Sequence, residues 1–368
     1  MTLTMLPPAP KDVGRLSDVF VSALGAIVGG DDNRLKLPRV NSSLVVLIDG
    51  LGYLNLKEHA GHARILSRLL ANSGDRAIRC GFPSTTAVSL TSLGTGLTAG
   101  THGVLGYQLL GNDGAVRNML NGWRPDEDPR QWQPNQTISE RATANGLTST
   151  MIAAKEYKGS GFTNVIMGDI RFEGVDDISE RTKTANRLTN SRGQLNYLYF
   201  AELDQAAHRH GVGSPNWLNA LEQIDQSLSA LTGPFGILIT GDHGVKNVDA
   251  VDHIYLDLIP GFSEAVSFAV GDPRALFCYG DFQSAKVALE TSGVDGFVAT
   301  FTELAELGWV SGQQTRDLVP DFVLVAKGKT AFYDRRTAKV QSLKMIGQHG
   351  GVDDVETRVP LIRAGLFI

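Results

Sequence analysis

Residues 44–50 read Leu-Val-Val-Leu-Ile-Asp-Gly, an apolar run that ends abruptly at an aspartate and a glycine. Such a continuous apolar run is typical of a strand buried on both faces, as in a parallel sheet covered by helices on each side. Ligands of open α/β sheets collect outside the carboxyl ends of the strands, which is where Asp49 would lie. The segment therefore predicts an α/β fold and marks Asp49 as a candidate functional residue.

The same pattern recurs further along the chain. Residues 196–200 (Asn-Tyr-Leu-Tyr-Phe) lead toward Asp204, and residues 235–240 (Phe-Gly-Ile-Leu-Ile-Thr) lead into Gly-Asp242. Residues 149–153 predict a further strand. Because parallel strands end at the same edge of a sheet, the three aspartates are expected to converge there.

Helical spacing separates these strands. Apolar residues over 217–228 share one helical face, with Ser214 as a plausible cap and a proline in the first turn. Apolar residues over 16–27 also recur at helical spacing, which favours an amphipathic helix of the mature protein over a signal peptide. Strands alternating with helices imply a mostly parallel central sheet flanked by helices.

The hydrophobic pattern of the sequence changes between residues 254 and 335. Shorter apolar runs lie there among glycine, aspartate and proline. We therefore expect residues 1–253 and 336–368 to form the catalytic core, and residues 254–335 to form a smaller inserted α+β lobe.

Composition narrows the functional classes. The chain has 368 residues, with 34 Lys and Arg against 39 Asp and Glu, which gives a net charge of −5. A mildly acidic chain has no general attraction for a nucleic-acid duplex or an anionic membrane. Only Cys80 and Cys278 occur, so a disulfide framework is not expected. We expect a cytoplasmic protein without a transmembrane helix.

Histidines accompany the strand-end aspartates. A single aspartate at the end of a strand is more often a turn residue or a helix cap. These aspartates differ because histidines lie close to two of them in the sequence. Asp204 and His208 form an (i, i+4) pair on one helical face, and Asp242 is directly followed by His243. A third histidine, His349, lies in the glycine-rich segment Gly-Gln-His-Gly-Gly. Together with Asp49 these residues suit zinc, with manganese or iron as alternatives, and suffice for two metals acting on phosphorus.

A candidate nucleophile lies in the segment 81–90, which begins a helix rich in small residues. Backbone N–H groups at a helix N-terminus favour a developing anion and can hold a phosphoryl group. A bound metal would activate a threonine hydroxyl there. The alternative is that Ser84 or Thr85 simply caps the helix, and both can hold if one hydroxyl caps and the next attacks.

The motifs also match a known family. They occur in the family's order: Asp49-Gly-Leu-Gly, the threonine at the helix start, Thr95-Gly-Leu, Thr101-His-Gly-Val, Asp204-x-x-x-His208, Asp242-His243-Gly and Gln348-His349-Gly. Together they resemble the alkaline phosphatase superfamily, specifically its nucleotide pyrophosphatase/phosphodiesterase branch. The resemblance spans positions 49 to 349 and implies an alkaline-phosphatase-like core.

The resemblance implies two zinc ions and a nucleophile. One ion would be held by Asp204, His208 and His349, and the other by Asp49, Asp242 and His243 with Thr86 as a further ligand. In this branch the nucleophile lies nine residues before the threonine of Thr-Gly-Leu, which here points to Thr86. A phosphothreonine intermediate would follow, with the backbone N–H of Ala87 as a candidate oxyanion donor.

Some positions depart from the family pattern. Residues 87–89 are Ala-Val-Ser where Phe-Pro-Asn is usual, and Tyr107 stands near the place of a phosphate-binding asparagine, with Asn112 shortly after. Either could replace the missing amide. Lys155 is a candidate for the lysine that phosphomonoesterases of the superfamily add, although a solvated surface lysine is the simpler interpretation.

Three functions remain open at this stage. The first is a two-metal phosphodiesterase or nucleotide pyrophosphatase acting on a small phosphate ester, such as a nucleotide. The second is a phosphomonoesterase or phosphonate hydrolase on the same scaffold. The third, a catalytically inactive binding protein, is disfavoured because all six protein ligands and Thr86 are present. The substrate and the oligomeric state are left open.

Overall fold

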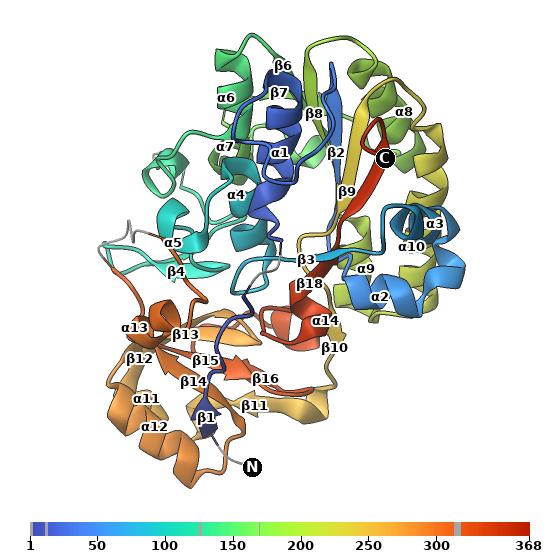
Figure 1. Ribbon diagram of the computed structural model, residues 1–368. Coiled ribbons are helices and arrows are strands. Elements are labelled where there is room, and N and C mark those ends of the chain that lie inside the picture. The colour runs from blue at the N-terminus through green and yellow to red at the C-terminus, as the bar shows by residue number, and fades with distance from the viewer. Residues whose placement is uncertain (1–2, 12–13, 125–126, 169, 313–317) are drawn as a thin grey trace.

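The computed structural model describes residues 3–11, 14–124, 127–168, 170–312 and 318–368. Its larger part is built on a six-stranded sheet, seen in the upper half of Figure 1. The strand order is β19 (Ile362–Gly365), β9 (Gly236–Thr240), β2 (Ser43–Ile48), β8 (Gln194–Phe200), β6 (Thr148–Ala153) and β7 (Arg171–Gly174). Neighbouring strands are parallel except for β19, which runs antiparallel to β9 at the edge. The predicted mostly parallel sheet is confirmed.

The central strand β2 is buried along its whole length, because alternate side chains enter two different apolar cores. Val45 and Leu47 pack into one core with helices α1 (Ser17–Val28), α4 (Thr86–Thr95), α6 (Ile138–Ala144) and α7 (Gly161–Met167). Leu44, Val46 and Ile48 pack into the other. This two-sided burial explains the uninterrupted apolar run.

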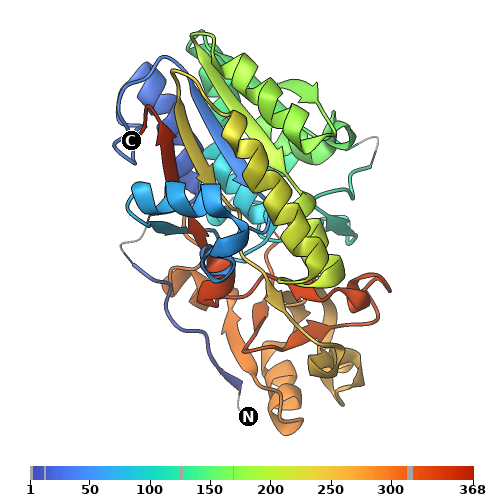
Figure 2. The same ribbon diagram turned by 90° about the vertical axis from the view of Figure 1, so that its right-hand side faces the viewer.

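The second core lies under the remaining large helices, which stand in front of the sheet in Figure 2. They are α3 (Arg64–Asn72), α8 (Ile178–Thr189), α9 (Glu202–His210) and α10 (Pro215–Ser227). The helix predicted after Ser214 is confirmed as α10. Its cap is confirmed too, because the Ser214 hydroxyl oxygen accepts the backbone N–H of Trp217 at 3.3 Å.

The smaller part of the molecule, the lobe, forms the lower half of Figure 1. Its five-stranded sheet has the order β1 (Leu3–Met5), β14 (Gly296–Thr300), β15 (Phe322–Ala326), β13 (Ala275–Gly280) and β12 (Val266–Asp272). The helices α11 (Phe262–Ala265), α12 (Phe282–Thr291) and α13 (Phe301–Glu306) accompany it.

One strand of the lobe comes from the start of the chain. The N-terminal segment descends from α1 to the lobe, where β1 pairs in parallel with β14. The sequence assigned these residues to the core, because a three-residue strand carries no readable pattern of its own. The predicted limits of the lobe, 254–335, otherwise stay a prediction.

The remaining strands and helices are short. Paired strands are β3 (Ala77–Arg79) with β18 (Arg358–Pro360), β10 (Lys246–Asn247) with β17 (Gly347–Gln348), β11 (His253–Tyr255) with β16 (Ala331–Tyr333), and β4 (Gln108–Leu110) with β5 (Val116–Asn118). The short helices are α2 (Tyr53–Glu58), α5 (Ala99–His102) and α14 (Asp354–Thr357).

We expect the substitution Leu47→Ala to lower the free energy of unfolding by about 2–5 kcal/mol, because it leaves a cavity beside the central strand. Leu47 is fully buried. Equilibrium urea unfolding would measure the change. Val287→Ala is the control, because Val287 is 61% exposed on α12 and should change stability by less than about 0.5 kcal/mol. Equal effects of the two substitutions would contradict the assignment of β2 to the core.

Candidate active site

Thr86 is the first residue of α4, and its side chain is buried. Its hydroxyl oxygen lies 3.1 Å from Nε2 of His243 and 3.5 Å from Oδ1 of Asp49. The preceding Thr85 is in the cap position but makes no side-chain capping bond, and its hydroxyl instead donates to Asp272 at 3.3 Å. The Ser84 hydroxyl donates to the carbonyl of Gly351. The alternative in which Ser84 or Thr85 caps the helix through its side chain is therefore wrong, because both hydroxyls have partners elsewhere.

The strand-end acidic residues and histidines gather into two groups, in each of which the possible ligand atoms lie within 4.8 Å of one another. One group is Asp49, Asp242 and His243, which follow β2 and β9. The other is Asp204 and His208 on α9, with His349 after β17. The groups are adjacent, since the rings of His243 and His349 stack with their centroids 3.7 Å apart.

The surrounding contacts suit metal binding. The Nδ1–H of His349 donates to the carbonyl of Ser84 at 2.9 Å, and that of His208 to the carbonyl of Gly347 at 2.8 Å. A carbonyl accepts only, so each ring keeps a proton on Nδ1 and turns its Nε2 toward the group, where Nε2 of His208 lies 3.0 Å from Oδ2 of Asp204. Oδ1 of Asp204 and Oδ2 of Asp242 are buried without a hydrogen-bond partner. Buried, unpaired carboxylate oxygens beside imidazole nitrogens fit a divalent cation.

The pKa shifts of these residues also favour a bound cation. Burial, together with the charges of Asp242 and Asp204, raises the pKa of Asp49 well above its usual value. Burial would lower the pKa of His208, but the charge and hydrogen bond of Asp204 outweigh it and raise the pKa to about 9. Burial lowers the pKa of His349. A bound cation would counter the repulsion among these carboxylates.

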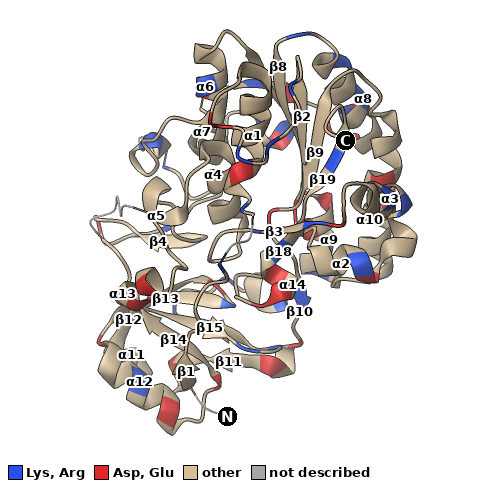
Figure 3. Cartoon of the chain, in the orientation of Figure 1, with Lys and Arg blue, Asp and Glu red and all other residues tan. Residues whose placement is uncertain are grey.

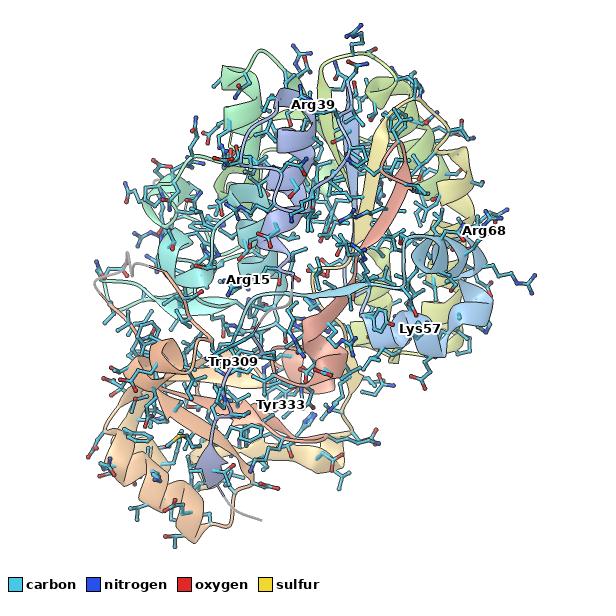
Figure 4. The ribbon with its side chains drawn as sticks, viewed as in Figure 1. Arg15, Arg39, Lys57, Arg68, Trp309 and Tyr333 are labelled. Carbon is cyan, nitrogen blue, oxygen red and sulfur yellow. The ribbon has the colours of Figure 1, made fainter. Side chains whose placement is uncertain are left out.

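A cavity of about 560 Å³ lies above these groups, between the core and the lobe. Thr86, Asp49 and His349 line one wall. Core side chains that include Leu90, Phe162 and Ile166 form an apolar part, and lobe residues that include Tyr333, labelled in Figure 4, form another. The site therefore combines a polar, acidic floor with largely apolar walls.

The structure brings some predicted substrate-binding residues to this cavity and not others. Tyr107 lines it, and the side-chain N–H of Asn118 donates to the Tyr107 hydroxyl at 2.7 Å. Ala87 is buried as the second residue of α4, where a backbone N–H has no partner inside the helix. Asn112 is exposed in the turn between β4 and β5 and does not line the cavity. Lys155 also lies away from it: the side chain is 71% exposed and paired with Asp176 at 3.1 Å.

Sequence reasoning missed two residues next to the metal-ligand groups. The Tyr199 hydroxyl donates to Oδ2 of Asp49 at 2.5 Å and would hold that carboxylate in place. Asp272, from the lobe, is buried beside Thr85 and lies 4.0 Å from Nδ1 of His349. Tyr199 is the last residue but one of β8, within a strand that the sequence predicts, whereas no local sequence pattern marks Asp272.

Comparison with known proteins decides the family. The family model described as type I phosphodiesterase / nucleotide pyrophosphatase matches residues 43–352. The chain belongs to this family. Membership makes it a hydrolase of the phosphodiesterase type, and it accounts for a core of alkaline-phosphatase type with candidate metal-ligand groups at the strand ends.

Solved structures show the same fold. The murine ectonucleotide pyrophosphatase/phosphodiesterase 5 matches with a TM-score of 0.67 and 17% identity over 87% of each chain. The human protein of that name matches with a TM-score of 0.64 and 16% identity, over 88% of this chain and 87% of that one. A further murine structure, an inactive variant in complex with AMP, matches with a TM-score of 0.66 and 17% identity over 87% of each chain. No match was found among curated protein sequences.

The outer surface adds little to the site. In Figure 3 the positions of lysine and arginine are interspersed along the ribbon with those of aspartate and glutamate. Among the described residues, no helix is both long and apolar enough to cross a membrane.

We expect zinc affinity to rise with pH between about 6.5 and 9. In the metal-free protein the raised pKa of His208 means that the protonated ring adds stability below pH 6.5, and that this is lost as the pH rises through about 9. Zinc requires the neutral ring, so binding at pH 7.5 should release the His208 proton. Calorimetric titration in buffers of different ionisation enthalpy would count the protons released.

The control for this measurement is His62→Gln, which removes an exposed histidine paired with Glu222, away from both groups. It should leave the proton count unchanged. An affinity for zinc that did not vary between pH 7 and 9 would contradict the raised pKa of His208.

Proposed function

We propose that this chain is a two-metal phosphodiesterase of the nucleotide pyrophosphatase type, acting on a small phosphate ester through a phosphothreonine intermediate on Thr86. The observation that carries the proposal is the position of the Thr86 hydroxyl. It lies at the N-terminus of α4, within 3.5 Å of two members of one metal-ligand group. The second group lies directly beside the first.

Two divalent cations, for which zinc is our proposal, would supply activation of the threonine hydroxyl and neutralise charge at the phosphate and the leaving oxygen. Asp49, Asp242 and His243 would hold one, and Asp204, His208 and His349 the other. Tyr199 would keep the Asp49 carboxylate oriented through its 2.5 Å hydrogen bond.

The chain's own residues account for the two chemical steps. The Thr86 hydroxyl loses its proton as its oxygen attacks phosphorus and forms a new P–O bond. The bond to the leaving alcohol or nucleotide breaks, and that proton neutralises the leaving oxygen. Water then attacks the phosphothreonine, releases the phosphate product and restores the hydroxyl. The N-terminus of α4, with the backbone N–H of Ala87, would stabilise the charge on the non-bridging oxygens. The Tyr107 hydroxyl, supported from behind by Asn118, would donate to one of these oxygens.

The charge of the cavity favours a diester over a monoester. Among the described residues that line the cavity, Lys339 at the lobe is the only lysine or arginine, whereas several lining residues are acidic. A monoester carries up to two negative charges at phosphorus and would need a basic partner close to Thr86, which Lys155 does not supply. A phosphonate hydrolase would face the same shortage. The cytoplasmic location expected from the sequence stays a prediction.

We expect Thr86→Ala to lower kcat toward bis-p-nitrophenyl phosphate by at least about 10³-fold, because it removes the nucleophile. Thr86→Ser should keep measurable activity, since it retains a hydroxyl. Thr143→Ala is the control, because Thr143 is an exposed residue of α6 away from the cavity. Activity of Thr86→Ala close to wild type would rule out the phosphothreonine.

Wild-type protein loaded with zinc should hydrolyse bis-p-nitrophenyl phosphate with a kcat/KM at least about tenfold above that for p-nitrophenyl phosphate, which corresponds to about 1.4 kcal/mol. The reason is the missing basic partner for a dianion. Release of p-nitrophenolate measures both reactions. A preference for the monoester would move the assignment to a phosphatase, and no turnover of either substrate would argue for the inactive binding protein.

A further inference from the structure

The lobe reaches the metal-ligand groups through the turn between β12 and β13. Asp272, at the end of β12, packs so closely on Gly350 that a Cβ atom at Gly350 would lie 2.7 Å from the Asp272 Cβ. Gly350 has a φ of 119° and directly follows His349. The same aspartate accepts the hydroxyl of Thr85, the residue before the nucleophile. This turn of the lobe therefore touches both the loop of His349 and the segment of Thr86.

Two residues further along the turn, Arg274 makes a fully buried ion pair. Its Nε and Nη2 donate to the two carboxylate oxygens of Glu356, each at 2.7 Å, and neither side chain is exposed. Nη1 donates to the carbonyl of Thr330 at 2.7 Å. Taking two charges out of water is costly, so such a pair persists only with good geometry and further hydrogen bonds. Here both conditions are met, and the pair holds the turn to α14 rigidly.

Glu356 passes this constraint to the loop of His349. Its Oε1 also accepts the backbone N–H of Gly351 at 2.9 Å. A Cβ atom at Gly351 would lie 2.8 Å from Oε2 of Glu356, so the close approach depends on the glycine. The loop is closed from the other side by Ser84, whose hydroxyl donates to the carbonyl of Gly351 at 2.8 Å and accepts the N–H of Gly350.

We propose that Arg274 is a positioning residue for His349, acting through Glu356 and Gly351. The inference rests on the proposed function, in which Asp204, His208 and His349 bind a metal. Arg274 donates no hydrogen bond to the other group, Asp49, Asp242 and His243. Glu356 does touch that side, but through its backbone carbonyl, which accepts the N–H of Gly244 at 2.8 Å and is left in place when Arg274 is replaced. Loss of Arg274 should therefore weaken one metal site selectively.

The test is Arg274→Met in the full-length protein, titrated with zinc against a competing chelator. Wild type should bind two equivalents. In the variant one affinity should stay within about threefold, and the other should fall by about 10–100-fold, as is usual for losing a residue that orients a ligand. Arg274→Lys, which keeps the charge but not the planar fork, should fall between the two. Adding Arg274→Met to His349→Ala should cause no further loss, because both act on the same ligand.

Arg117→Met is the matched control. Arg117 is also a buried arginine, paired with Asp113 and Glu127, but it has no link to either metal-ligand group. It should lower the melting temperature and leave both zinc affinities unchanged. If Arg274→Met only lowered the stability of the protein, it would lower both zinc affinities or neither. Either result would overturn the proposal. Full additivity of Arg274→Met with His349→Ala would overturn it too.

Two outcomes need a separate readout. If Arg274→Met does not fold, Arg274→Lys carries the test, and unchanged affinities in that variant would overturn the proposal. If the wild type binds no zinc, the proposed function fails. Amide hydrogen exchange of Gly351 in the metal-free protein then decides the inference: Arg274→Met should speed it at least about tenfold, and an unchanged rate would overturn it.

Discussion

Repulsion among buried carboxylates is the constraint on which the rest of this structure depends. Asp49, Asp204 and Asp242 lie in one buried floor, where burial and the charges of Asp242 and Asp204 raise the pKa of Asp49, and burial and the charge of Asp204 raise the pKa of Asp242. Three parallel strands bring them together, because the strands end at the same edge of the sheet. Without a cation, histidine rings and a tyrosine hydroxyl are what offset this charge. The fold thus stores, at one edge of its sheet, an electrostatic strain that a pair of metal ions would relieve.

The surrounding contacts keep that floor from rearranging. Tyr199 holds Asp49, the carbonyl of Ser84 holds His349, and the carbonyl of Gly347 holds His208. Each contact fixes a ring or a carboxylate of the two metal-ligand groups. The lobe adds to this frame through the turn that carries Asp272 and Arg274, so it does more than cover the cavity. It is part of the support of the site.

Much of this could be predicted from the sequence, because the informative residues are local. The buried strands and the helix after Ser214 follow from periodicity, and the six metal-ligand candidates follow from their position at strand ends and from the family resemblance. What could not be predicted depends on contacts between distant segments. Asp272 and Arg274 have no local pattern, and the exposure of Asn112 and Lys155 depends on how their loops turn. The hydrogen-bond partners of Ser84 and Thr85 could not be predicted for the same reason, because they lie on distant segments of the chain.

The strand β1 carries a consequence for how the chain is made. Leu3–Met5 are synthesised before the six-stranded sheet, yet β14, against which they pair, follows every strand of that sheet except β19. The N-terminal segment must therefore wait unpaired while the core forms around α1, and can dock only when the lobe has been built. A segment synthesised before the core is thus among the last to reach its native place, and it closes the lobe along the edge of its sheet.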